Sequence, residues 1–229
     1  MPARIKKVYI EEQIIKGRRL GRHVEHDPRS KAFGVVGQVE IHTVRHRTFG
    51  QVLDQGNRGS CTGNATAGAL NTKGLHRPGT KVLYEPDAIS LYSLATQLDN
   101  FPGNYPPDDT GSSGLAVAKA AQQKGYILEY RHAFSLNEAL QGLMAGPVIT
   151  GVNWYEGFDK PDPNGIIKIA GQVRGGHEFF IGGYDAKAKL LTAVNSWGMR
   201  YGKNGKFFIP LDVWDQLLSE QGDCTILVN

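Results

Sequence analysis

The sequence predicts an α+β protein with helices in its first half and β-strands in its second half. Between residues 61 and 145, four stretches carry helical patterns or helix-boundary signals. After residue 147 the hydrophobic period changes, and short runs rich in Val, Ile, Leu and Phe alternate with Gly, Asp, Asn and Lys. This order is typical of a protein with two lobes and a site in the cleft between them.

Two helices are predicted before residue 100. Residues 61–73 are small and helix-compatible, and they follow a turn that contains Gly56 and Gly59. Residues 85–98 have a proline close to their start and apolar side chains at helical spacing. Residues 100–114 are rich in Gly, Pro, Asp and Ser, so we expect a loop there.

Two more helices are predicted before the period changes. Residues 115–124 are helix-compatible up to the glycine that follows them. Ser135 and Glu138 have the spacing of a capping box, which predicts a short helix that ends at Gly146–Pro147. Strands are then predicted for five β-prone runs: 147–152, 178–184, 190–195, 206–210 and 225–228.

The first fifty residues are predicted to be an irregular basic arm with one short strand at 38–43. They hold 11 Lys and Arg against 5 Asp and Glu, whereas the rest of the chain holds 15 against 17. A basic arm can indicate a nucleic acid or an acidic surface. Because these basic residues are scattered among acidic ones, an arm that packs across the domain is the favoured interpretation, and we expect no nucleic-acid partner.

Length and composition predict a soluble globular chain. Of the 229 residues, 40% are hydrophobic and 21% are charged. No apolar run approaches the roughly 18 residues that cross a bilayer. The N-terminus lacks the apolar core of a secretory signal. We therefore expect cytoplasmic synthesis, no membrane partner and a monomer, with the final location of the protein left open.

Cysteine usage excludes two kinds of structural site. Cys61 and Cys224 are the only cysteines, so they do not make a disulfide framework, and they are too few for structural zinc. The His23 and His26 pair also supplies too few ligands. We expect no metal and no cofactor, and a special cysteine here is expected to be reactive.

The segment DQGNRGSC, residues 54–61, predicts such a cysteine. Cys61 opens the first predicted helix, where the dipole and free N–H groups stabilise a thiolate. His177 opens one predicted strand and Asn195 ends the next, so an Asn carbonyl could orient the imidazole and leave its other nitrogen for the sulfur. The Gln55 amide and the Cys61 backbone N–H could converge on the oxygen of a tetrahedral intermediate.

The chain resembles the papain-like cysteine peptidase family in three segments, QGNRGSC, GGHEFFIGGY and NSWGMRYGKNGKFFIP, which occur in the family's order. The resemblance extends from about residue 52 to 227. It implies a helical N-terminal lobe, an antiparallel, β-barrel-like C-terminal lobe, and an active site in the cleft between them. The implied division is a basic arm at 1–50, a helical lobe at 51–133 and a β-rich lobe at 134–229.

The resemblance also implies a role for each residue of the site. Cys61 would be the nucleophile, His177 the general base and acid, and Asn195 the residue that orients His177. Gln55 would contribute to the oxyanion hole, and Trp197 would shield the Asn195–His177 hydrogen bond from water. The substrate pocket would be lined by small residues, which suggest room for a large apolar or aromatic side chain: Ser113, Gly114, Gly151, Gly175 and Gly176.

Three departures from the family pattern stand out. Arg58 occupies the place of a cysteine that many members pair in a disulfide, so the chain resembles a disulfide-free microbial or viral branch, of phage or bacterial origin. Thr62 replaces a tryptophan that often follows the nucleophile. Glu178 follows His177 where a small residue is usual, and strand alternation would turn it away from His177.

Residues 1–50 could cover the cleft until cut, although permanent packing is the favoured interpretation.

Three functions are compatible with these residues. The first is a thiol-dependent endopeptidase that acts on polypeptides through an acyl group on Cys61. The second is a cell-wall peptide hydrolase or transpeptidase with the same Cys–His–Asn site, which the lack of a wall-binding repeat disfavours. The third is a binding or assembly protein with idle catalytic residues, which the intact set of Gln55, Cys61, His177 and Asn195 disfavours.

Overall fold

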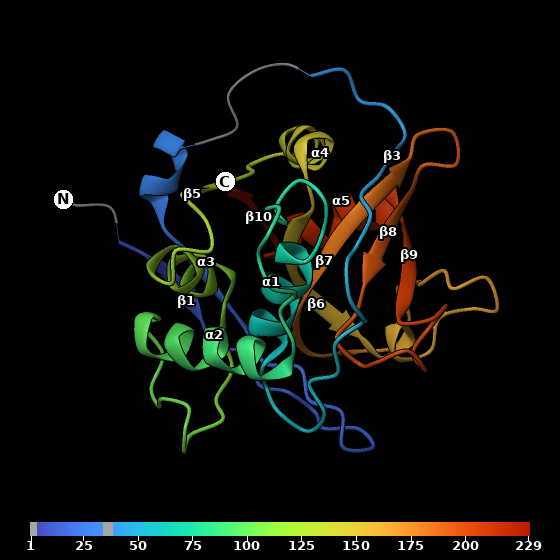
Figure 1. Ribbon diagram of the computed structural model, residues 1–229. Coiled ribbons are helices and arrows are strands. Elements are labelled where there is room, and N and C mark those ends of the chain that lie inside the picture. The colour runs from blue at the N-terminus through green and yellow to red at the C-terminus, as the bar shows by residue number, and fades with distance from the viewer. Residues whose placement is uncertain (1–3, 34–38) are drawn as a thin grey trace.

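The computed structural model describes residues 4–33 and 39–229, and it confirms the α+β class. Figure 1 shows helices α1, α2 and α3 gathered on one side and the long strands of a sheet on the other. The described part of the chain has five α-helices: α1 Cys61–Leu70, α2 Glu85–Leu98, α3 Gly114–Gln123, α4 Leu136–Ala145 and α5 Leu211–Ser219. It also has two 3-10 helices, η1 Pro28–Phe33 and η2 Glu156–Asp159.

Local signals predicted the first four helices within a few residues. Helix α2 has a proline in its first turn, where a fixed φ suits the helix and no N–H bond is lost. Helix α4 is capped by Ser135, whose hydroxyl accepts from the Glu138 N–H at 3.2 Å. Helix α5 was not predicted. It is short, and it is held by burial of Trp214 and Leu217 against the sheet.

The larger sheet forms the second half of the fold. Its strands lie in the order β5–β10–β6–β7–β8–β9, with β3 also paired to β7, and every pair is antiparallel. All five predicted runs lie in it. The strands are β3 Val44–Arg45, β5 Glu129–His132, β6 Val148–Tyr155, β7 Val173–Asp185, β8 Leu190–Val194, β9 Lys206–Pro210 and β10 Asp223–Val228.

The strand expected at 38–43 is wrong. Residue 38 lies outside the described residues, and residues 39–43 are not in a strand. The pairing begins only at Val44, which lies opposite Tyr184 of β7. The partner strand therefore decides where β3 starts.

A smaller sheet joins the N-terminal arm to the helical lobe. It consists of β1 Lys6–Val8, β2 Arg22–His26 and β4 Ser112–Ser113, in the order β1–β2–β4. Strand β2 runs parallel to β4, with Arg22 opposite Ser112, and it also packs against β7. The arm is thus held between the two lobes.

Two hydrophobic clusters lie on either side of the sheet. One, which includes Trp154, Phe179 and Phe207, packs under α4 and α5. The other joins α1, α2 and α3 to Phe180 and other strand residues. The second cluster contains residues of both predicted lobes, so the hydrophobic core does not divide at residue 133. The predicted lobe boundaries at residues 50 and 133 therefore stay a prediction.

Helix α1 lies between α2 and strand β7, and every one of its residues is buried. Its small side chains allow this position. A Cβ at Gly68 would lie 2.5 Å from Phe180 Cε1, and a Cβ at Gly63 would meet the backbone of Ala88. This close packing places the first residue of the helix against the strand that carries His177.

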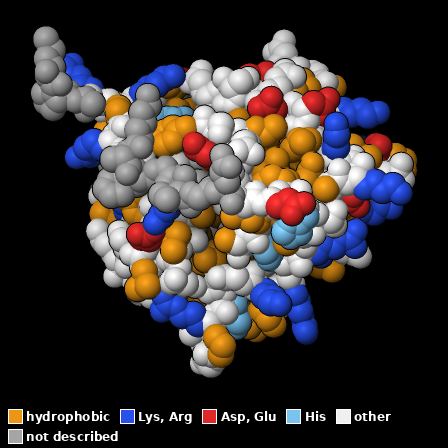
Figure 2. All heavy atoms as spheres, turned by 90° about the horizontal axis from the view of Figure 1, so that it is seen from above, with side chains coloured by type: hydrophobic (Ala, Val, Ile, Leu, Met, Phe, Trp, Pro, Cys, Tyr) orange, Lys and Arg blue, Asp and Glu red, His pale blue; other side chains and the backbone are white. Residues whose placement is uncertain are grey.

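The surface carries mixed charge. On the face seen in Figure 2, Lys and Arg side chains lie in small groups among hydrophobic, acidic and neutral ones. Across the described residues, no helix combines the length and apolar character needed to cross a bilayer.

Candidate active site

Cys61 is the first residue of α1 and is fully buried. Ser60 precedes it without capping the helix, because its hydroxyl donates to Asn64 Oδ1 at 2.9 Å. The N–H groups of the first turn are therefore free of a side-chain cap, and the positive end of the helix dipole lies beside the thiol.

His177 is fully buried in β7, and its Nε2 lies 2.7 Å from Asn195 Oδ1. The amide oxygen can only accept, so Nε2 carries the proton and the neutral ring has its lone pair on Nδ1. Nδ1 is buried, and it has no hydrogen-bond partner among the described residues. Nδ1, the ring nitrogen that could take a proton from a thiol, therefore belongs to β7, the strand against which α1 packs.

Two indole rings enclose the His177–Asn195 pair. The Trp197 ring lies 5.1 Å from the imidazole, centroid to centroid, and the Trp154 ring contacts it edge-on at 4.6 Å. Both tryptophans are buried. Two buried indole rings beside the imidazole are the arrangement that the expected shielding role of Trp197 requires.

Gln55 bridges the two halves of the site. Its Oε1 accepts from the Ser196 hydroxyl at 2.6 Å. Its Nε2 donates to three backbone carbonyls, those of Arg58 at 2.7 Å and of Arg19 and Leu20 at 3.2 Å each. The amide predicted to bind an oxyanion thus donates to a neighbouring carbonyl, that of Arg58, and to two carbonyls of the N-terminal arm.

Residues 18–25 of the arm lie in the groove between the helical lobe and the sheet, and we call them the strap. The Gly21 carbonyl accepts from the Ser112 N–H at 2.8 Å on one wall. On the other wall, Leu20 is so close to Gly175 that a Cβ there would lie 2.6 Å from Leu20 Cδ1. The strap therefore spans the groove between the helical lobe and the sheet.

Burial governs the ionisation of Cys61 and His177. Burial, with a further contribution from the Glu178 carboxyl, raises the pKa of the Cys61 thiol well above its usual range. Burial lowers the pKa of His177 to about 3, against the opposing effect of the bond to Asn195. With the strap in place the pair is a neutral thiol and a neutral imidazole. Burial of both groups therefore disfavours a thiolate–imidazolium ion pair in this form.

Sequence comparisons find no match, since no protein-family model and no curated protein sequence matches this chain. Comparison with solved structures does find similar proteins. Xylellain, a cysteine protease from Xylella fastidiosa, aligns with a TM-score of 0.67 at 18% identity over 100% of this chain and 98% of its own. Digestive procathepsin L 3 of Tenebrio molitor aligns with a TM-score of 0.67 at 14% identity over 96% of this chain and 76% of its own. Procathepsin B S9 of Trypanosoma congolense gives 0.61 at 12% identity, covering 96% and 91%. The chain has a papain-like fold.

In this papain-like fold, the strap occupies the predicted substrate pocket. The Ser113 hydroxyl donates to the Glu25 carboxylate at 2.6 Å. Gly175 lies against Leu20, and Gly176 lies against the carbonyl of Arg22. Gly151 lies against the Arg22 side chain, and Gly114 lies beside the carboxyls of Glu178 and Asp223.

The pocket was expected to take an apolar side chain, but its lining contains two carboxyl groups. Glu178 does point away from His177, as alternation requires, but this direction takes it into the pocket, where it is fully buried. Asp223, at the start of β10, lies beside it. The sequence placed neither carboxyl there, because Asp223 lies 45 residues after Glu178 in the chain and only the sheet makes them neighbours.

Ser196, whose hydroxyl donates to Gln55 Oε1, was also missed by the sequence analysis. The signal was available in the Asn-Ser-Trp-Gly segment, because a hydroxyl next to Asn195 lies at the correct end of β8. The backbone N–H of Ser196 donates to Asn195 Oδ1 at 2.8 Å. Ser196 thus fixes both Asn195 and Gln55.

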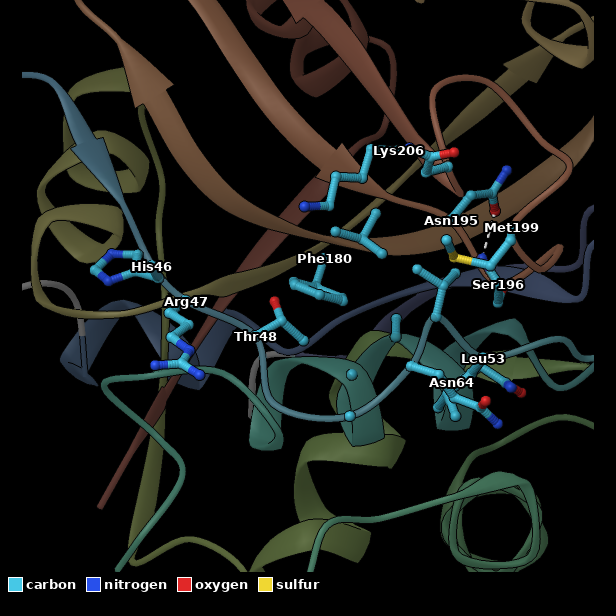
Figure 3. A pocket seen from close by; sticks show the side chains of 17 residues that line it. His46, Arg47, Thr48, Leu53, Asn64, Phe180, Asn195, Ser196, Met199 and Lys206 are labelled. Carbon is cyan, nitrogen blue, oxygen red and sulfur yellow. Dashed lines mark hydrogen bonds between the residues drawn. The ribbon is translucent and has the colours of Figure 1, made fainter.

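An open cavity of about 490 Å³ borders the site on its other side. Figure 3 shows Asn195 and Ser196 at one end of it and His46, Arg47 and Thr48 at the other, with Phe180 between them. None of the residues that line it belongs to the strap. The cavity and the strap-filled groove are therefore separate.

His23 and Cys224 lie in packed positions away from the His177–Asn195 pair. His23 is buried, its Nδ1 accepts from the Ile10 N–H at 3.1 Å, and its ring stacks on Tyr9 at 4.2 Å. Cys224 is a free, buried thiol in β10, and Cys61 is likewise free.

Proposed function

We propose that this protein is a cysteine peptidase that cleaves polypeptides through an acyl-enzyme on Cys61. The observation that carries the proposal is the hydrogen bond of 2.7 Å between His177 and Asn195, which leaves Nδ1 of the buried ring without a partner in the described part of the chain. The ring belongs to a strand packed along the helix that Cys61 opens. The papain-like fold supports this assignment.

The proposed reaction has two steps. Cys61 gives its proton to His177 Nδ1, and its sulfur attacks the peptide carbonyl carbon to form a C–S bond. The C–N bond breaks, and His177 returns the proton to the leaving amine. Water then loses a proton to His177 and attacks the thioester, after which the C–S bond breaks and releases a carboxylic acid product and the thiol. Gln55 and the Cys61 N–H would hold the oxyanion in both steps.

The strap keeps this chemistry inactive in the closed form. It excludes water, so neither charged form of the pair is stabilised. It also engages the Gln55 amide. Activity then requires the strap to leave the groove, so that the helix N-terminus and a protonated His177 can stabilise the Cys61 thiolate.

Gly21 offers a specific way to displace the strap. Gly21 has φ +107°, and a Cβ there would collide with the backbone of Gly59. Gly17 is a matched control, since it has φ +73° and nothing within 4 Å of its Cβ position. Both alanine substitutions strain the backbone, but only Gly21→Ala pushes the strap from the groove.

The test measures alkylation of Cys61 by iodoacetamide at about pH 6, where an unperturbed thiol is protonated. We expect Gly21→Ala to react at least about tenfold faster than Gly17→Ala or the unmodified chain, because the thiolate becomes stabilised. Adding His177→Ala to Gly21→Ala should abolish this gain and the cleavage of fluorogenic peptides. Cys224 is the internal control, because its alkylation would report unfolding.

Two results would contradict the proposal. One is a Cys61 thiol in the Gly21→Ala chain that reacts no faster than a free thiol. The other is rapid alkylation without hydrolysis of any peptide in a mixed-sequence library. The second result would instead favour a binding protein whose catalytic residues are idle.

A further inference from the structure

Three charged groups meet in the pocket beneath the strap. A Cβ at Gly151 would lie 2.5 Å from Arg22 Nε, 2.5 Å from a Glu178 carboxyl oxygen and 3.1 Å from Asp223 Oδ2. All three side chains are buried. Gly151 and Gly114 therefore leave the space that these charged groups occupy.

Arg22 enters this pocket from an extended backbone, as the side chain of a bound peptide would. Its main chain pairs with Ser112, and its carbonyl lies against Gly176. Its Nη2 donates to Asp223 and to the Gln221 carbonyl, the latter at 2.7 Å. The strap thus shows which side chain the pocket accepts.

The pocket is not a fully satisfied ion pair. Among the described residues, both Glu178 carboxyl oxygens and Asp223 Oδ1 have no hydrogen-bond partner, and neither do Arg22 Nε and Nη1. A structural ion pair is stable in a core when its remaining donors and acceptors are satisfied. This pocket instead keeps unused acceptors facing unused guanidinium donors.

The pKa values of the Glu178 and Asp223 carboxyls are shifted in opposite directions, as expected for a pocket that binds one cation. Burial and the neighbouring Asp223 raise the pKa of Glu178 well above its usual range, against the effect of Arg22. Burial also acts to raise the pKa of Asp223, but Arg22, His132 and His26 outweigh it, so the Asp223 pKa is lowered. One carboxylate and one neutral carboxyl therefore face the guanidinium.

We propose that this pocket selects an arginine side chain of the polypeptide substrate, with Asp223 and Glu178 as the specificity-determining residues and Arg22 as their internal occupant. The inference rests on the proposed peptidase function. An apolar substrate side chain would bury the Asp223 charge without a counter-ion. Arginine is favoured over lysine, because its planar fork serves two carboxyls at once and is more weakly hydrated.

The first test needs no turnover. In the full-length Arg22→Ala chain, we expect millimolar propylguanidinium to raise the melting temperature and its neutral isostere propylurea to leave it unchanged. The unmodified chain, in which Arg22 fills the pocket, should not respond. Adding Asp223→Asn to Arg22→Ala should abolish the response, whereas adding Asp212→Asn, an exposed aspartate of the same lobe, should preserve it. Equal responses to both compounds would overturn the inference.

The second test compares peptides that carry arginine or citrulline at each position before the cleaved bond. The enzyme is the chain that carries both Gly21→Ala and Arg22→Ala, because activity requires the strap to leave the groove. Citrulline keeps the shape of arginine and loses its charge. We expect kcat/KM to favour arginine by roughly a hundredfold at one position, as expected for a buried charge pair. Asp223→Asn should bring this ratio towards one, and Asp212→Asn should not. If Asp223→Asn fails to fold, the ratio measured with the Gly21→Ala, Arg22→Ala chain decides.

The outcomes separate the two proposals. Hydrolysis that is indifferent to arginine and citrulline would overturn the specificity inference and leave the peptidase function standing. An inert Cys61 and no hydrolysis of any peptide would overturn the peptidase function. In that case the propylguanidinium response would still report whether the pocket binds cations.

Discussion

Gln55 donates a hydrogen bond from its side-chain amide to the backbone carbonyl of Leu20, over 3.2 Å. This contact joins the catalytic groove to a residue of the strap that lies 35 positions earlier in the chain. It means that one donor proposed for the oxyanion hole is engaged by the protein's own backbone. The strap and a substrate carbonyl would therefore compete for Gln55.

Replacing Gln55 by alanine should change two measurements in opposite directions. The strap loses an anchor, so alkylation of Cys61 by iodoacetamide should become faster. The oxyanion loses a donor, so kcat for peptide hydrolysis should fall by about a hundredfold or more. Gln123→Ala, at an exposed position in α3, is the control and should change neither. A parallel rise in both rates would mean that Gln55 only anchors the strap.

Asn195→Ala should slow hydrolysis through the orientation of His177. The imidazole loses its 2.7 Å acceptor, and general acid–base catalysis by a well-placed histidine contributes on the order of 10²- to 10⁴-fold. In the Gly21→Ala background, we expect kcat to fall within this range while KM stays nearly constant. Asn164→Ala, an exposed asparagine of the same lobe, is the control. A rise in KM with kcat unchanged would contradict a positioning role.

Trp197→Ala should raise the pKa of His177. Burial is the main reason that this pKa is lowered to about 3, and the Trp197 ring lies 5.1 Å from the imidazole. Opening this side to water should move the pKa towards the ordinary histidine value of about 6.5. A proton NMR titration of the His177 ring measures it, with Met199→Ala in the same loop as the exposed control. An unchanged pKa would show that Trp154 and the strap suffice for burial.

Acid should destabilise the folded protein through its buried histidines. Because the His177 pKa is lowered to about 3, its stabilising contribution is complete above about pH 6.5 and is lost as the pH falls towards 3. His23, His26 and His132 also have lowered pKa values, chiefly from burial, and act in the same direction. The Asp99 carboxyl has the opposite sign, since burial raises its pKa to about 6.

Urea unfolding between about pH 7 and pH 4.5 checks this sign. Each buried histidine can remove up to about 1.4 kcal/mol of unfolding free energy per pH unit below its unfolded pKa. The loss should be smaller in His177→Gln than in the unmodified chain. Exposed His42→Gln should follow the unmodified chain, and a His177→Gln curve as steep as the unmodified one would contradict the assignment.

Local sequence signals determined most of the helices and strands. Ser135 with Glu138, the proline near the start of α2, and the β-branched runs of β6 to β10 each act within a few residues, so their effect can be read without the fold. The resemblance of short motifs then indicated Cys61, His177, Asn195 and Gln55. The structure brings the last three into direct contact with one another or with Ser196, and it confirms the papain-like fold.

The tertiary structure alone decided where the strap lies and what the pocket contains. Strand β2, with the sequence RHVEH, has the composition of a solvated surface segment, yet four of its five residues are buried. It is buried because hydroxyls and carboxyls from distant elements meet its charges: Ser113 meets Glu25, and Asp223 meets Arg22. Such pairings depend on which strands become neighbours in space, and no local period encodes them. The sequence by itself thus determined most of the elements and indicated the candidate site residues, and the packing of distant elements decided the closed groove and its charge.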